Sequence, residues 1–150
     1  MHQRFDIAMH SADSYRALIA LERTFEQSSI DRPLRELVKL RVSQVNGCAF
    51  CIDMHWKDLR AGGEPEHRLY ALNAWRESPF YSDRERAALD WAEAVTLITQ
   101  GHVPDDVYER VRPHFSDKEL SDLTVVVATI NTWNRVAIPN RTQVPQHDQA

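Results

Sequence analysis

Two cysteines, a histidine and a glutamate are the residues of this chain whose types and spacing could do chemistry. Cys48 and Cys51 are the only cysteines, His55 follows the second by four residues, and Glu36 precedes the first by twelve. Positions i, i+3 and i+7 of a helix share one face, so we expect both thiols and the imidazole on one side of a helix. Such a group is typical of thiol chemistry.

The residues themselves leave open which of the two cysteines reacts first. A CxxC pair at a helix N-terminus holds two sulfurs close enough to form a disulfide, and the helix dipole there stabilises the thiolate of Cys48. His55, one turn beyond Cys51, could accept the proton of the Cys51 thiol and then pair with its thiolate. The dipole therefore favours Cys48 as the reactive thiol, whereas the imidazole favours Cys51.

Glu36 joins this group only if the chain turns back after it. On one unbroken helix Glu36 would lie about 120° round the axis from Cys48. The helix that carries Glu36 is therefore expected to end at Asn46-Gly47, with the next helix folding back. A carboxylate brought to His55 in this way would orient the imidazole and raise its basicity.

The bulk composition is that of one soluble domain. The chain has 150 residues, of which 43% are hydrophobic and 27% charged, and its net charge is −4. This acidic balance offers no basic footprint for nucleic acid. We find no apolar run long enough to cross a membrane and no signal peptide, and we expect a cytoplasmic protein. In that compartment a lone CxxC is more often catalytic, redox-active or metal-binding than a structural disulfide.

Helix signals follow one another along the whole chain, and hairpin signals are missing. Helix starts are expected at Ser11, Asp31, Cys48, Pro65, Ser82, Pro104 and Ser116. The last helix is expected to run to about Val136, and Pro139 to begin a polar tail. The sequence therefore predicts an all-α, compact bundle of six to seven helices, with one domain over residues 1–138 and a tail over 139–150.

The spacing Glu36, Cys48-x-x-Cys51-x-x-x-His55 and its flanking residues resemble the alkylhydroperoxidase D-like group of the carboxymuconolactone decarboxylase superfamily. The resemblance includes the segments 39–48 and 130–135 and extends over roughly residues 5–138. It implies an all-α fold that assembles into homo-oligomers, commonly trimers or hexamers. It also implies an antioxidant peroxidase that reduces hydrogen peroxide or organic peroxides without a cofactor or a metal.

The same resemblance implies a role for each site residue. Cys51 would attack the peroxide and become a sulfenic acid, and Cys48 would resolve it to a disulfide. Cys48 would also be the point of attack for a disulfide reductant that the sequence does not identify. Glu36 and His55 would relay the proton. Phe50 departs from the better-studied peroxidases of the group, which carry a histidine there, and this makes the pocket more apolar.

Other interpretations of the cysteine pair stay open. The pair could be a structural disulfide or two core thiols, or it could bind zinc with His55, although no second CxxC is present. It could also serve a redox-sensing or partner-binding module without turnover. A lyase like the carboxymuconolactone decarboxylases is disfavoured, because proton chemistry on a lactone does not need two thiols.

The remaining conspicuous side chains have structural interpretations. We expect Asp53 to be solvated, and Asn131 and Arg135 to tie helices together. We expect surface positions for His67, His102 and His114. We expect packing in the core or between subunits for Trp56, Trp75, Trp91 and Trp133.

Overall fold

The structure is a computed structural model that describes residues 2–145. Within that range it contains eight α-helices and no strand, which confirms the all-α prediction. The helices are α1 (Ile7–His10), α2 (Ala12–Thr24), α3 (Arg32–Asn46), α4 (Ala49–Ala61), α5 (Glu66–Tyr70), α6 (Asp83–Thr96), α7 (Asp105–Val111) and α8 (Asp117–Asn140). The helix beyond those expected is the single turn α1.

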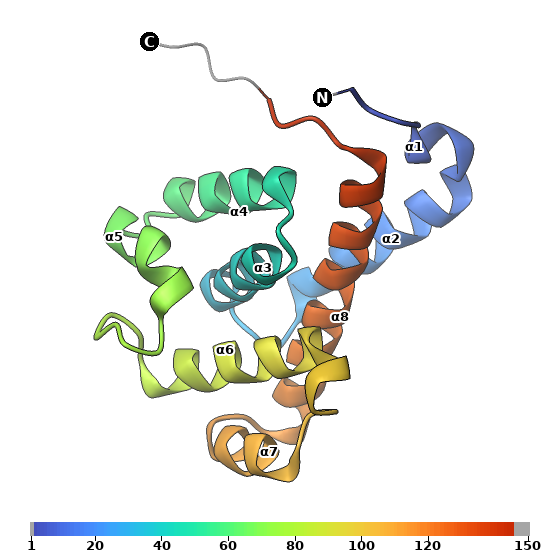
Figure 1. Ribbon diagram of the computed structural model, residues 1–150. Coiled ribbons are helices and arrows are strands. Elements are labelled where there is room, and N and C mark those ends of the chain that lie inside the picture. The colour runs from blue at the N-terminus through green and yellow to red at the C-terminus, as the bar shows by residue number, and fades with distance from the viewer. Residues whose placement is uncertain (1, 146–150) are drawn as a thin grey trace.

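Helix α3 lies at the centre of the molecule and packs against α4, α6 and α8 (Figure 1). Its apolar side chains are buried: Leu34, Leu37, Val38, Leu40 and Val42. Because three helices surround α3, its polar residues Lys39 and Ser43 are buried as well. The sequence pattern did not predict the burial of these two polar side chains.

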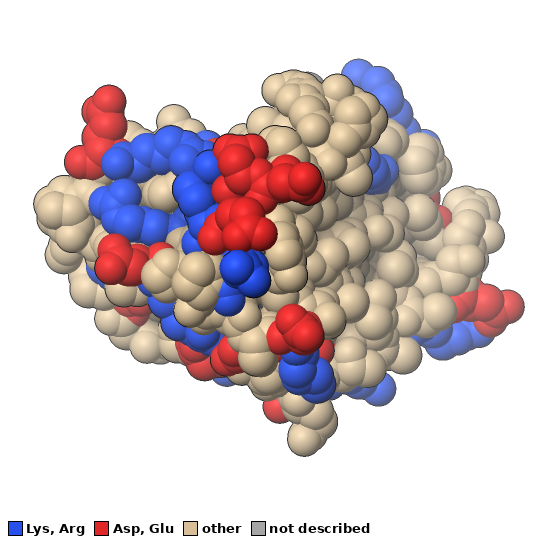
Figure 2. Space-filling view, turned by 90° about the horizontal axis from the view of Figure 1, so that it is seen from below, with Lys and Arg blue, Asp and Glu red and all other residues tan. Residues whose placement is uncertain are grey.

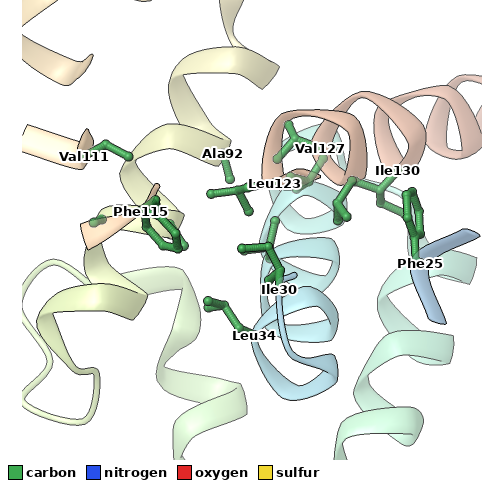
Figure 3. Close-up of a cluster of buried hydrophobic side chains, with 14 of the residues drawn as sticks. Phe25, Ile30, Leu34, Ala92, Val111, Phe115, Leu123, Val127 and Ile130 are labelled. Carbon is green, nitrogen blue, oxygen red and sulfur yellow. The ribbon is translucent and has the colours of Figure 1, made fainter. Parts of the chain in front are cut away.

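Two apolar clusters hold α3 from either side. The first lies between α3, α6, α7 and α8 and includes Ile30, Leu34, Ala92, Val111, Phe115, Leu123, Val127 and Ile130 (Figure 3). The second lies between α3, α4, α5 and α6 and includes Leu37, Leu40, Leu59, Leu69, Leu72, Trp75 and Leu89. Each fully buried aliphatic side chain contributes about 1.5–3 kcal/mol. The relative placement of α3 and α4 is therefore set by the core.

The predicted helix starts carry the expected caps. The Asp31 side chain accepts a hydrogen bond from the Leu34 amide at 3.0 Å. Ser82 and Ser116 each open a capping box. Ser11 occupies the N-cap position of α2 without a side-chain hydrogen bond.

The C-terminal helix is longer than predicted. It continues past Val136 to Asn140 and includes Pro139 in its last turn. A proline there removes one amide near the helix end and leaves the rest of the hydrogen-bond ladder intact. The Arg4 amide donates to the Asn140 carbonyl at 2.9 Å, so the segment before α1 lies beside the end of α8 (Figure 1). Residues 146–150 of the expected tail lie outside the described residues.

Charges of both signs alternate on the surface. Figure 2 shows acidic and basic side chains interleaved on one half of the face it presents, and mostly uncharged surface on the other half. Asp90, for example, accepts from Arg76 at 2.7 Å and from Arg110 at 3.0 Å. No helix among residues 2–145 is both long and apolar enough to span a membrane.

The chain reverses between α3 and α4, as the sequence predicted. Helix α3 ends at Asn46, and Gly47 takes the left-handed conformation with φ 72° and ψ 33°. The Cys48 amide then donates to the Ser43 carbonyl at 3.0 Å, which closes the end of α3. Helix α4 starts two residues after the glycine and packs back on α3.

Replacing this glycine should destabilise the fold through the backbone. An added Cβ at Gly47 would meet no atom within 4 Å, so Gly47→Ala introduces only the strain of a left-handed residue. We expect a loss of about 1–2 kcal/mol in the free energy of unfolding, measured with urea. Gly47→Asn should lose less, because asparagine tolerates this conformation. An alanine variant as stable as the parent would contradict this explanation of the turn.

Candidate active site

The helix reversal brings three of the four predicted site residues to one cavity. Glu36 comes from α3, and Cys51 and His55 come from α4. The Nδ1 atom of His55 lies 2.8 Å from Oε2 of Glu36, so the carboxylate reaches the imidazole as expected. All three side chains line a cavity of about 420 Å³.

The fourth residue, Cys48, is joined to Cys51 by a disulfide, with the two Cα atoms 5.3 Å apart. Cys48 is the N-cap residue of α4, and Cys51 lies in its first turn. Each cysteine is only 2% exposed, and both pack against Ala137 of α8. Cys51 lines the cavity, whereas Cys48 is not among its lining residues.

Glu36 is a buried carboxylate that stays ionised. Burial raises its pKa, but the hydrogen bond from His55 and the positive charge of Lys39 outweigh that effect and lower the pKa to about 2. An anionic Glu36 can accept the Nδ1–H of His55, and in a neutral imidazole so bonded Nε2 is the unprotonated nitrogen. Nε2 is buried and has no hydrogen-bond partner among the described residues. The imidazole is therefore a base with a free nitrogen at the cavity.

Lys39 and Glu22 are parts of the site that sequence reasoning missed. The Nζ atom of Lys39 lies 2.8 Å from Oε2 of Glu22 and 3.4 Å from Oε1 of Glu36. The other oxygen of Glu22 accepts from Nε1 of Trp133 at 3.1 Å. A lysine within the apolar run Leu37-Val38-Lys39-Leu40 was the available signal, since the helix buries its neighbours on both sides.

Apart from the exposed Asp58, the rest of the cavity wall is apolar or aromatic. It is formed by Tyr15, Ile19, Phe50, Met54, Ile130, Trp133 and Ala137. Tyr15 and Trp133 meet edge to face, with ring centroids 5.6 Å apart. Phe50 lies on this wall and makes it more apolar, as predicted from its place in the CxxC motif. Trp133, expected only to pack, also faces the cavity.

Asn131 ties helices together as expected, whereas Arg135 forms its hydrogen bonds within α8. Asn131 accepts from Asn46 of α3 at 3.0 Å and donates to Thr96 of α6 at the same distance. Arg135 donates to the Asn131 side chain at 2.7 Å. Neither residue lines the cavity, which agrees with the structural interpretation.

The other side chains interpreted from the sequence are placed as follows. Trp75 is buried, and the remaining tryptophans pack half-buried against the two core clusters. His67 and His102 are exposed as expected, whereas His114 is half-buried. Asp53 accepts from Lys57 at 2.7 Å and its side chain is 20% exposed, so it is less solvated than expected.

One group of side chains near the cavity has the composition of a cation site. Glu36, His55 and Asp58 each offer a ligand atom, and these atoms lie within 4.8 Å of one another. Both oxygens of Glu36 are already matched to side-chain donors, one from His55 and one from Lys39. Protein groups thus supply the positive charge at this carboxylate, and we assign no metal ligands here.

Two curated bacterial proteins are similar to this chain. The uncharacterized protein YdfG of Bacillus subtilis is 47% identical over 92% of this chain and 94% of its own length. The uncharacterized protein YnjA of Escherichia coli is 35% identical over 74% of this chain, which spans 59% of that longer protein.

Solved structures share the fold. A protein of unknown function from Agrobacterium tumefaciens, named as a candidate antioxidant defence protein AhpD, superposes with a TM-score of 0.94. It is 43% identical, with 97% of this chain and 100% of that one covered. An uncharacterized peroxidase-related protein with an AhpD core, from Ralstonia eutropha, has a TM-score of 0.81 at 22% identity, covering 93% of this chain and 74% of that one.

The profile of the carboxymuconolactone decarboxylase family matches residues 9–94, a range that includes Glu36, both cysteines and His55. The chain belongs to the carboxymuconolactone decarboxylase family and has an AhpD-like fold.

Proposed function

We propose that this protein is a thiol-dependent peroxidase that reduces hydrogen peroxide or an organic hydroperoxide through Cys48 and Cys51. One observation carries the proposal: the free, buried Nε2 of His55, oriented by an ionised Glu36, shares a cavity with Cys51. Peroxide reduction needs a thiolate as the nucleophile and a proton for the leaving oxygen. An imidazole at this place serves both needs.

In the first step, Nε2 of His55 accepts the proton of the Cys51 thiol. The thiolate attacks the terminal peroxide oxygen, an S–O bond forms, and the O–O bond breaks. The leaving oxygen takes the proton back from the imidazolium and departs as water or an alcohol. Cys51 is left as a sulfenic acid, and the peroxide has received two electrons.

In the second step, the Cys48 sulfur attacks the Cys51 sulfenic sulfur. The S–S bond forms, the S–O bond breaks, and the hydroxyl leaves as water with the proton of the Cys48 thiol. The product is the disulfide found between these residues. An external dithiol must then supply two electrons to restore both thiols.

Access to the disulfide limits how such a reductant can attack. Both sulfurs belong to residues that are 2% exposed. A small thiol could approach Cys51 from the cavity. Attack at Cys48, which the family resemblance implies, requires the first turn of α4 to move away from Ala137.

The disulfide also favours a redox role over lactone decarboxylation. Moving protons on a lactone uses neither the formation nor the cleavage of an S–S bond, whereas peroxide reduction uses both. We also propose a cytoplasmic location, because the thiol pools of that compartment can reduce the disulfide again after each turnover.

We further propose that the chain works as a homo-oligomer, a trimer or a hexamer. Several large apolar side chains are exposed in the single chain, including Met9, Tyr70, Ile98 and Val125. Apolar surface of this kind is commonly buried between subunits.

Separate serine variants test the order of the cysteines. Cys51→Ser should reduce peroxide consumption to the uncatalysed rate, because the attacking sulfur is lost. Cys48→Ser should consume one equivalent and stop, with the sulfenic acid trapped on Cys51 by dimedone and located by mass spectrometry. A dimedone adduct on Cys48 would reverse the assigned order. Stoichiometric oxidation of the parent without turnover, in excess dithiol, would support the redox switch instead.

Removing the imidazole tests the proton relay. His55→Ala should raise the pKa of the reduced Cys51 thiol, because the thiolate loses a partner that can carry positive charge. The pH profile of alkylation by iodoacetamide measures this pKa and should move to higher pH. His67→Ala serves as the matched control, since His67 is exposed and packs on Phe80. An unchanged profile in His55→Ala would remove the imidazole from the relay.

The pKa of Glu36 makes the folded state sensitive to acid. It falls from 4.5 to about 2 on folding, so the ionised carboxylate stabilises the protein above pH 4.5, and this is lost as the pH drops toward 2. Between pH 7 and pH 3 we expect the parent to lose about 2 kcal/mol more stability than Glu36→Gln. Urea unfolding at both pH values measures the difference. Equal losses would show that Glu36 is not held as an anion.

A further inference from the structure

The buried ammonium group of Lys39 lines the cavity, and the mechanism above does not use it. It lies between Glu22 of α2 and Glu36 of α3, within 4 Å of a carboxylate oxygen of each. The Lys39 side chain is 7% exposed, and the two glutamates are 26% and 13% exposed. Burying an ammonium group costs several kcal/mol unless it is paired. Lys39 is thus matched to two carboxylates in a largely water-free place.

We propose that Lys39 and Glu22 are positioning residues of the Glu36–His55 relay and that their opposite charges tune the reactivity of the Cys51 thiol. Lys39 binds one oxygen of Glu36 while His55 binds the other, so the carboxylate is fixed at both ends and cannot rotate away from the imidazole. Glu22 balances the charge of Lys39 and holds the ammonium group in place. The inference rests on the proposed function, because the relay it refers to is that of peroxide reduction.

Of the other charges around Glu36, Arg32 and Asp58 are exposed, and Glu64 is paired with Arg68. Asp58 of α4 is exposed and lines the cavity, and it also lines a neighbouring one of about 460 Å³ together with Arg32, Glu36 and Glu64. Helix α8 contributes only uncharged residues to the cavity wall: Ile130, Trp133 and Ala137. Water screens charges at an exposed edge far more than buried ones. Lys39 and Glu22 are therefore expected to have the largest electrostatic effect on the site.

The two residues are expected to shift the pKa of the Cys51 thiol in opposite directions. A positive charge near the cavity favours the thiolate of Cys51, so removing Lys39 raises the pKa of that thiol. A negative charge disfavours the thiolate, so removing Glu22 lowers it. A role limited to holding α2 in place would not give opposite shifts, since losing either partner breaks the same ion pair.

The test measures the alkylation of Cys51 by iodoacetamide against pH, in reduced protein carrying Cys48→Ser. Lys39→Met should move the midpoint up by about one pH unit, and Glu22→Gln should move it down. The double variant should return close to the starting value, and Lys39→Arg, which keeps the charge, should leave it unchanged. Lys118→Met is the matched control, because Lys118 is 70% exposed and pairs with Asp122 at the start of α8.

Shifts in the same direction, or no shift in either variant, would overturn the proposal. Should Lys39→Met fail to fold, as judged by circular dichroism, Glu22→Gln decides the matter, since it keeps the size and the hydrogen-bonding oxygen of the side chain. Alkylation needs no peroxide turnover. Opposite shifts in a protein that consumes no peroxide would therefore support the Lys39–Glu22 assignment and refute the peroxidase. Peroxide turnover without opposite shifts would support the peroxidase and refute the assignment.

Discussion

The site depends on a buried hydrogen bond between a carboxylate and an imidazole, and the surrounding helices must hold these two groups in contact. Glu36 and His55 lie on consecutive helices, 19 residues apart, and their polar atoms are 2.8 Å apart. Consecutive helices can bring such residues together only if the chain reverses sharply between them. Gly47 provides the reversal, and the second apolar cluster holds α4 against α3. The bond is costly to bury and is stable because donors satisfy both carboxylate oxygens.

The parts of the site predictable from sequence are those set by local geometry. The positions of Cys51 and His55 on one helical face follow from helical periodicity, and the turn at Gly47 follows from the need for a left-handed residue. The caps at Ser82 and Ser116 have a recognisable spacing for the same reason. These features depend on residues only a few positions apart, so the sequence contains the information directly.

The parts that could not be predicted depend on contacts between distant segments. Glu22 meets Lys39 across 17 residues and Trp133 across 111, and no short-range pattern specifies either distance. Lys39 looks like a solvated lysine until α4, α6 and α8 close around its helix. The extension of α8 through Pro139 was missed because a proline near a helix end is tolerated, whereas one in the middle is not. Tertiary packing decides the cases of Glu22 and Lys39.

Helix α2 has no fully buried residue, yet it supplies Tyr15, Ile19 and Glu22 to the cavity wall. The helices that form the core and the helix that closes the site are therefore largely different pieces of the protein. A helix attached by half-buried apolar side chains, an ion pair, one indole hydrogen bond and a ring contact opens at a lower free energy than the helices of the core. Access to the buried sulfurs can therefore change without a matching change in global stability. Substitutions on α2 are expected to alter that access more than the free energy of unfolding.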